Sequence, residues 1–219
     1  MFETFGSDRY SRFALNDLDH KLAELIPQRR GFFIEAGGND GLSQSNTYAF
    51  ERFRRWRGML IEPVPELARL CRANRPRAIV VPAALVADDS VTSVPMKSAN
   101  LMSRVAGTFA TKAEEVEYLR TAQDAQDLDG IYDIVVPART LSSILEEHRI
   151  VKIDLFSLDV EGYEIEVLKG LDLTRFRPTF MVVETKQLDA FRPYVDPYYD
   201  FVKQLTYHDY FFRSRSATN

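Results

Sequence analysis

Four acidic residues stand at the ends of short apolar runs, and they are the first candidates for chemistry. Each follows a stretch of Phe, Ile, Leu, Met or Val: Glu35, Glu62, Asp159 and Glu184. Such runs are typical of buried strands in a parallel sheet, whose carboxyl ends lie along one edge where ligands bind. Carboxylates gathered there are costly unless they meet a cation, an amino group or hydroxyls. We therefore expect a ligand crevice rather than four unrelated helix caps or surface ion pairs.

A glycine-rich turn follows the first of these acids and narrows the choice of ligand. The fingerprint of dinucleotide sites places glycines at i, i+2 and i+5, but Ala36 occupies the first of these positions, ahead of Gly38 and Gly41. A carboxylate before the turn is unfavourable beside a pyrophosphate, whereas it suits a ligand with an ammonium and a sulfonium group. The sequence also lacks the phosphate-loop motif of nucleoside triphosphate sites. The turn thus favours S-adenosylmethionine over a dinucleotide.

Composition limits the class of protein. A chain of 219 residues with 45% hydrophobic and 27% charged residues is typical of one globular α/β domain. A net charge of −4 argues against a nucleic-acid partner, which needs a basic face. The single cysteine, Cys71, excludes an intramolecular disulfide. No apolar signal core and no run of about 18 apolar residues is present, so we expect a cytoplasmic protein without a membrane span.

Helix and strand signals alternate along the chain and predict the elements that position the acids. Strands are expected at 32–34, 58–61, 78–81, 91–96, 155–158, 179–184 and 207–212. Helices are expected over 16–26, 47–53, 64–75, 112–123, 141–147, 163–169 and 196–204. Repeated strand–helix steps favour right-handed βαβ units. The prediction is an α/β fold with a mostly parallel central sheet, an antiparallel C-terminal strand and helices on both faces.

The whole chain, 1–219, is expected to form a single domain with two additions. Residues 1–30 are expected to form an N-terminal helical segment, in which the helix 16–26 is stopped by Pro27. Residues 98–130 form an insertion or lid over the ligand end of the sheet, or else a solvated surface excursion.

Two stretches of the chain resemble a known family. Phe33-Ile34-Glu35-Ala36-Gly37-Gly38-Asn39-Asp40-Gly41 resembles the cofactor loop of FkbM-type methyltransferases, and the stretch from Ser157 to Gly170, SLDVEGYEIEVLKG, is similar to that family's most distinctive motif. The resemblance covers roughly Gly31 to Glu184. It implies a Rossmann-like class I methyltransferase fold, S-adenosylmethionine as the cofactor, and O-methylation of a hydroxyl on a sugar or another natural product.

The resemblance also implies which residues surround the cofactor. The glycine turn would hold the methionine part, Glu62 would accept the ribose hydroxyls, and two small residues after the third strand would let adenine lie flat. The residues placed at the cofactor in this way are Glu35, Gly37, Gly38, Asn39, Asp40, Gly41, Ser43, Glu62, Pro63, Ala83, Ala84 and Asp159. Asp159 and Glu161 would face the methyl group.

Methyl transfer to an alcohol needs a group that takes or stabilises one proton. The candidates for this catalytic role are Asp159, Glu161 and His208; the histidine has the best pKa for a general base. A rival mechanism holds a divalent cation such as Mg²⁺ on Asp159, Glu184 and Glu161, because carboxylate oxygens are its preferred ligands.

Two other classes of function stay open from sequence. One is an NAD(P)-dependent oxidoreductase on a Rossmann fold, which the missing first glycine disfavours. The other is a non-catalytic, methyltransferase-like binding protein, which the four intact acids disfavour. The expected partner is a small-molecule hydroxyl acceptor, and a homodimer is possible.

Overall fold

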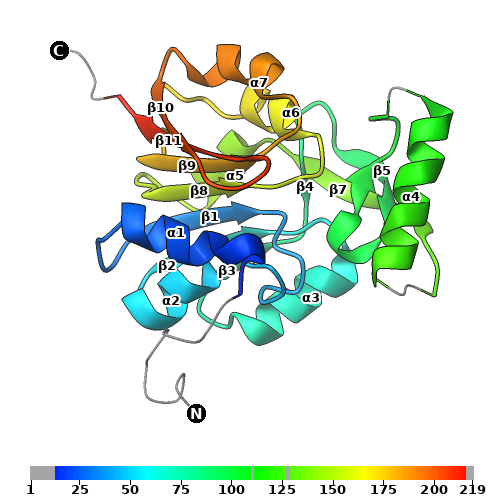
Figure 1. Cartoon of the computed structure of the whole chain (residues 1–219), viewed down its shortest axis with the longest axis horizontal. Helices are drawn as coiled ribbons and strands as arrows, with labels where there is room; N and C mark the ends of the chain where they lie inside the picture. Colours follow the sequence, from blue (N-terminus) through cyan, green and yellow to red (C-terminus); the bar gives the residue numbers. More distant parts are fainter. Residues whose placement is uncertain (1–12, 110, 127–128, 216–219) are drawn as a thin grey trace.

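The protein is built around a seven-stranded sheet (Figure 1). The computed structural model describes residues 13–109, 111–126 and 129–215. The strand order is β10-β11-β9-β8-β1-β2-β3. The bounds of these strands are β1 Phe32–Ala36, β2 Arg57–Ile61, β3 Ile79–Val81, β8 Leu155–Leu158, β9 Phe180–Glu184, β10 Tyr199–Gln204 and β11 Asp209–Ser214.

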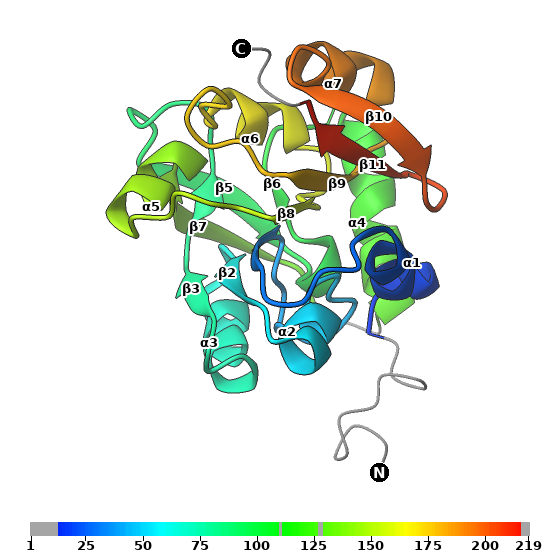
Figure 2. The same cartoon turned by 90° about the vertical axis from the view of Figure 1, so that its left-hand side faces the viewer.

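Only β11 runs against the direction of the other six strands. The pairs β1–β2, β2–β3, β1–β8 and β8–β9 are parallel, whereas β11 is antiparallel to both β9 and β10. The last strand of the chain therefore lies inside the sheet, between two earlier strands (Figure 2). This confirms the predicted α/β fold with a mostly parallel sheet and an antiparallel C-terminal strand.

Helices cover both faces of the sheet because neighbouring strand residues point to opposite faces. Phe33 packs with Leu22 of α1 (Leu18–Leu25) and Phe50 of α2 (Tyr48–Arg54) on one face. Ile34 packs on the other face with residues of α5 (Leu141–Glu147), α6 (Glu164–Lys169) and α7 (Leu188–Val195). The helix α3 (Pro65–Asn74) connects β2 to β3. Figure 2 shows the two helical layers on either side of the strands.

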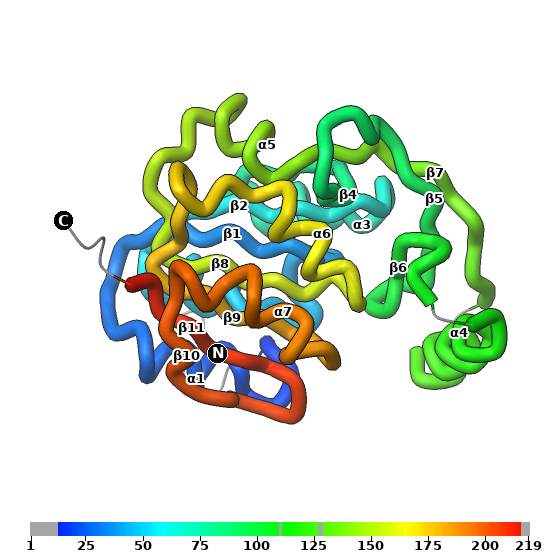
Figure 3. Tube along the Cα trace, turned by 90° about the horizontal axis from the view of Figure 1, so that it is seen from above, coloured from blue at the N-terminus to red at the C-terminus, as the bar shows by residue number. Residues whose placement is uncertain are grey.

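A second, four-stranded sheet stands beside the first, with the order β4-β7-β5-β6. Its strands are β4 Ala84–Leu85, β5 Ser93–Ser98, β6 Arg104–Val105 and β7 Tyr132–Arg139. The 3₁₀ helix η3 (Asn100–Met102) and the helix α4 (Lys112–Gln126) complete this part of the chain. In Figure 3 α4 lies at the far side of the molecule from β10 and β11. The segment predicted as an insertion, 98–130, thus contains η3, β6 and α4.

The sequence prediction lacks the helix α7 and the short strands β4 and β6, and it differs from the structure at two longer elements. Residues 196–204 were expected to form a helix, but the helix α7 ends at Val195 and Tyr199–Gln204 is strand β10. Its aromatic and β-branched residues favour a strand. The strand β7 was not predicted, although Val136 and Ala138 alternate into a small core of the second sheet. Pro137 within the run hides that alternation.

The N-terminal helical prediction is met in part. Residues 15–17 form a 3₁₀ turn and α1 follows, ending just before Pro27, whereas residues 1–12 lie outside the described part of the chain. No helix of the described residues is long and apolar enough to cross a bilayer.

Candidate active site

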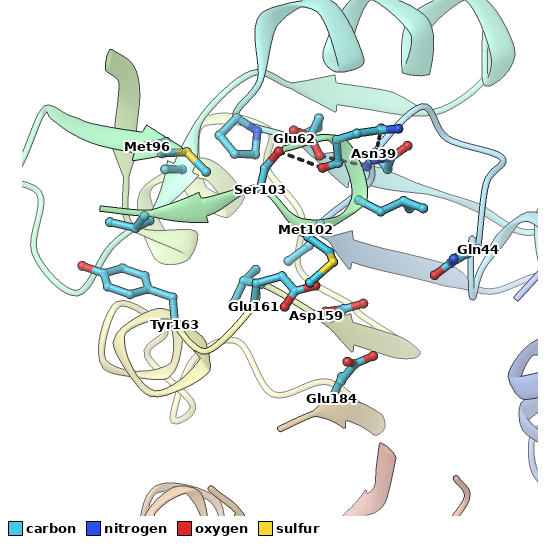
Figure 4. A pocket seen from close by; sticks show the side chains of 18 of the residues that line it. Asn39, Gln44, Glu62, Met96, Met102, Ser103, Asp159, Glu161, Tyr163 and Glu184 are labelled. Carbon is cyan, nitrogen blue, oxygen red and sulfur yellow. Dashed lines mark hydrogen bonds between the residues drawn. The ribbon is translucent and has the colours of Figure 1, made fainter. Parts of the chain in front are cut away.

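A cavity of about 740 Å³ opens at the carboxyl ends of β1, β2, β3, β8 and β9 (Figure 4). Its volume is within the range of sites for small molecules. Most of the residues predicted from sequence line it: Gly37, Asn39, Ser43, Glu62, Pro63, Ala83, Ala84, Asp159, Glu161, Glu184 and His208. The topology thus brings one sheet edge, the glycine turn and the segment before β11 around one space.

Four predicted cofactor residues do not line the cavity: Glu35, Gly38, Asp40 and Gly41. The buried Glu35 carboxylate instead accepts hydrogen bonds from Ser45 Oγ, Asn46 N (2.7 Å) and Thr47 Oγ1 (2.5 Å). Asp40 accepts hydrogen bonds from the backbone N–H groups of Leu42 and Ser43. These acids hold the turn in shape from behind.

Gly37 joins the turn to the end of β8. Its φ of +87° lies in the left-handed region, and a Cβ atom there would come within 1.9 Å of the carbonyl oxygen of Asp159. Only glycine combines that conformation with so close an approach of two backbones. The residue is required by the contact between turn and strand.

Glu62 closes β2 at one end of the cavity. Its Oε2 accepts from Asn39 N and its Oε1 from Val64 N, both at 2.8 Å. Burial raises the pKa of Glu62 to about 7, although these two N–H donors oppose the rise. Each oxygen retains a second acceptor position. With Pro63, Ala83 and Ala84 alongside, this end offers a carboxylate in an apolar wall.

Asp159 and Glu184 stand at the other end of the cavity with little to balance their charge. Burial, followed by the charges of Glu184 and Glu161, raises the pKa of Asp159 well above its usual range. Burial, followed by Asp209, Glu161 and Glu164, raises the pKa of Glu184 to about 7. Among the residues that the structure describes, none donates a hydrogen bond to the Asp159 carboxylate. In Figure 4 it lies between Glu161 and Glu184.

Glu161 sits in a sharp turn directly after Asp159. Its φ is +55° and that of Gly162 is +91°, so the chain reverses at once after β8. Its Oε2 accepts a hydrogen bond of 2.8 Å from the hydroxyl of Tyr118 on α4. Burial raises the pKa of Glu161, and the Tyr118 hydrogen bond opposes that rise. The turn therefore presents Glu161 to a helix of the second part of the chain.

His208 reaches the cavity because β11 pairs with β9. The pairing sets Asp209 opposite Glu184, and the backbone N–H of Thr185 donates to the carbonyl of His208. The His208 Nε2 atom consequently lies 3.0 Å from Glu184 Oε1. His208, predicted as a base, and Glu184, predicted as a ligand of a cation, thus form a pair.

Comparison with known families decides the class of protein. Residues 35–212 match the family described as "Methyltransferase FkbM domain". The chain belongs to the FkbM methyltransferase family. Methyl transfer with S-adenosylmethionine as donor is the activity that this membership implies, and it argues against the nicotinamide-dependent alternative. No curated protein sequence matches the chain.

A solved structure shares the fold of this FkbM methyltransferase. A putative S-adenosyl-L-methionine-dependent methyltransferase from Methanococcus maripaludis aligns with a TM-score of 0.50 and 7% identity, covering 92% of this chain and 85% of its own. A TehB-like SAM-dependent methyltransferase from Corynebacterium glutamicum gives a TM-score of 0.47 and 10% identity, covering 98% of this chain and 92% of its own. At such identity the likeness concerns the fold alone.

The three carboxylates predicted as ligands of a divalent cation do not form a metal site. Within the described ranges, no group of three or more His, Cys, Asp or Glu side chains is arranged to hold a metal ion. Asp159, Glu161 and Glu184 line the same space but are not gathered around a common point. We therefore derive no catalytic step through a metal.

The sequence offered residues 98–130 as a lid over the ligand end of the sheet or a surface excursion, but no residue of α4 was named as part of the site. The cavity-lining residues of α4 are Glu114, Glu117, Tyr118, Thr121, Ala125 and Gln126. Their three- and four-residue spacing marks one face of a helix. That signal was present in the sequence, but the polar character of the face concealed it, because a polar face normally indicates solvent.

Proposed function

We propose that the protein transfers the methyl group of S-adenosylmethionine to a hydroxyl group of a sugar or another small natural product. The observation that carries this proposal is one cavity lined by both the glycine turn and Asp159, whose backbone carbonyl packs directly against Gly37. A methyl donor held by the turn and an acceptor held at Asp159 would be neighbours there, as direct transfer requires.

The donor half of the cavity offers groups that match the parts of S-adenosylmethionine. Glu62 would accept hydrogen bonds from the ribose hydroxyls with its remaining lone pairs. Ala83 and Ala84 leave a flat apolar surface for adenine. The methionine part would lie along Gly37, Asn39 and Ser43, which form the cavity side of the turn.

In the reaction, the acceptor oxygen forms a bond to the methyl carbon as the carbon–sulfur bond breaks. The sulfur leaves as the neutral thioether of S-adenosylhomocysteine, and the hydroxyl proton must go to a base. Asp159 suits this role because no described residue donates a hydrogen bond to its carboxylate and its raised pKa makes it a stronger base than an ordinary carboxylate. The His208–Glu184 pair is a second proton acceptor, and Glu161 would orient the acceptor.

Calorimetry with S-adenosylmethionine, S-adenosylhomocysteine and NAD tests the donor directly. We expect both sulfur compounds to bind and NAD not to bind. Failure of both sulfur compounds to bind would overturn the proposal, and binding of NAD alone would indicate an oxidoreductase.

The acceptor class needs a separate assay. Sugars and secondary metabolites would be screened for uptake of label from methyl-labelled S-adenosylmethionine, with and without EDTA. We expect transfer to a hydroxyl, unchanged by the chelator. Donor binding without transfer to any acceptor would instead support a binding protein.

A further inference from the structure

The back of the glycine turn is held by the end of a single helix. Three consecutive backbone carbonyls of the turn each accept a hydrogen bond from a side chain at the C-terminal end of α3. The Sγ of Cys71 contacts the Asn39 oxygen at 2.8 Å. Asn74 Nδ2 donates to the Asp40 oxygen at 2.8 Å, and Arg75 Nη1 donates to the Gly41 oxygen at 2.9 Å. We name Cys71, Asn74 and Arg75 the α3 clamp.

Arg75 also supplies the positive charge that the buried acids of this region need. It is fully buried, and its Nε donates to Glu51 Oε2 at 2.6 Å, while Nη1 lies 3.8 Å from Glu35 Oε2. The guanidinium also donates to the hydroxyls of Ser45 and Thr47. It lies over the aromatic rings of Phe33 and Tyr48. Glu35 is therefore neutralised within the protein and needs no ligand ammonium.

The turn fits against the α3 clamp without spare room. Gly41 has a φ of +85°, and a Cβ there would come within 2.9 Å of Arg75 Cγ and 3.3 Å of Cys71 Cα. A Cβ on Gly38 would come closest to Leu60 of β2, at 3.2 Å, and would lie 3.5 Å from Cys71 Sγ. Gly41 is thus explained by contact with the helix end, and Gly38 by contact with the neighbouring strand, without a ligand.

The opposite side of the same turn forms the donor half of the cavity through Gly37, Asn39 and Ser43. Because its carbonyls are fixed from behind, the turn keeps one shape in the absence of a ligand. We infer that Cys71, Asn74 and Arg75 are positioning residues for the methyl-donor site, which hold the turn in its binding conformation before the donor arrives. This inference rests on the proposed function, since it assigns the turn to S-adenosylmethionine.

Such pre-ordering affects affinity, because the entropy lost when a flexible turn becomes ordered on binding weakens the binding free energy. Loss of one clamp hydrogen bond should therefore weaken donor binding although no clamp residue lines the cavity.

Asn74→Ala tests this inference with the least disturbance, because the residue is only half buried and the Arg75 charge network stays intact. The matched control is Arg69→Ala on the exposed side of the same helix, where Arg69 pairs with Glu66. We expect the Kd for S-adenosylmethionine to rise about threefold to tenfold in Asn74→Ala and to stay unchanged in the control. Hydrogen exchange of the amides of residues 39–43 in the free protein should accelerate in Asn74→Ala alone.

Arg75→Lys supplies the conservative comparison, since it keeps the charge and loses the fork of donors. Arg75→Met removes both and deprives Glu35 and Glu51 of their buried cation, so it should bind the donor more weakly than Arg75→Lys or fail to fold. Wild-type binding with unchanged affinity and exchange in Asn74→Ala and Arg75→Lys would overturn the inference and leave the proposed function standing. Absence of donor binding by the wild type would overturn both.

Discussion

The two halves of the cavity treat their carboxylates in opposite ways. On the donor side, Glu35 and Glu62 each accept at least two hydrogen bonds from the protein. On the acceptor side, Asp159 receives none from the described residues, and Glu184 faces a histidine and other acids. The donor side is complete before any ligand binds, whereas the acceptor side holds charge that a ligand must meet. Under the proposed function, the first half would bind the donor and the second would carry out the chemistry.

Replacement of one carboxylate on each side should separate donor binding from turnover. These variants should show the largest changes in kcat and Kd. We expect Asp159→Asn to lower kcat by about 10²–10⁴-fold, the usual contribution of a general base, with the Kd for S-adenosylmethionine nearly unchanged. Glu62→Ala should instead raise that Kd by about tenfold or more, because a charged hydrogen-bond acceptor is lost. Initial rates and calorimetry on both variants measure the contrast. Equal losses of affinity in the two variants would show that Asp159 belongs to the donor side.

Gly37 lies where the glycine turn meets the end of β8, and substitution there should lower the free energy of unfolding most. Gly37→Ala places a Cβ against the Asp159 carbonyl in a left-handed conformation, so we expect a loss of at least about 3 kcal/mol of unfolding free energy. Gly107→Ala is the matched control, because Gly107 has a φ of +79° and a Cβ built there meets no described heavy atom within 4 Å apart from its chain neighbours. That variant should lose only about 1 kcal/mol, the cost of the backbone conformation. Urea unfolding compares the two, and equal losses would remove the steric argument.

The excess charge of the acceptor side should appear in the pH dependence of stability. A carboxyl group whose pKa is raised by folding binds more protons in the folded state, so the stability it contributes below pH 4.5 is lost as the pH rises toward 7. Glu184 is such a group. Between pH 4.5 and 8 the wild type should therefore lose about 1–2 kcal/mol more than Glu184→Gln, after allowance for partial exposure of the side chain. Parallel stability curves for the two proteins would contradict this expectation.

The smallest effect is expected where α4 meets the acceptor side. Tyr118→Phe removes the hydroxyl that donates to Glu161, at a cost of about 1 kcal/mol. Because that hydrogen bond favours the charged carboxylate, its loss should raise the pKa of Glu161 and move the acidic limb of the rate profile to higher pH. Tyr132→Phe, at an exposed tyrosine, is the control and should leave the profile in place.

The site residues could be predicted from sequence where local rules of strand and turn geometry determine their positions. Acids after apolar runs and glycines after an acid follow from strand and turn geometry, so Glu62 and Asp159 were located at the correct edge. Distant pairings followed no such rule. The contact between Arg75 and Glu35 joins the residue after a helix to a strand end 40 positions earlier, and no spacing encodes it. The same holds for His208 and Glu184, which meet only because β11 pairs with β9.

The position of β11 has a consequence for how the protein is made. β10 leaves the ribosome before β11, yet within the described sheet it pairs with β11 alone. Without β11, the five parallel strands would expose β9 as an edge, and β10 would lack its partner in the described sheet. Insertion of β11 between β9 and β10 therefore completes this side of the sheet. The same pairing sets His208 beside Glu184.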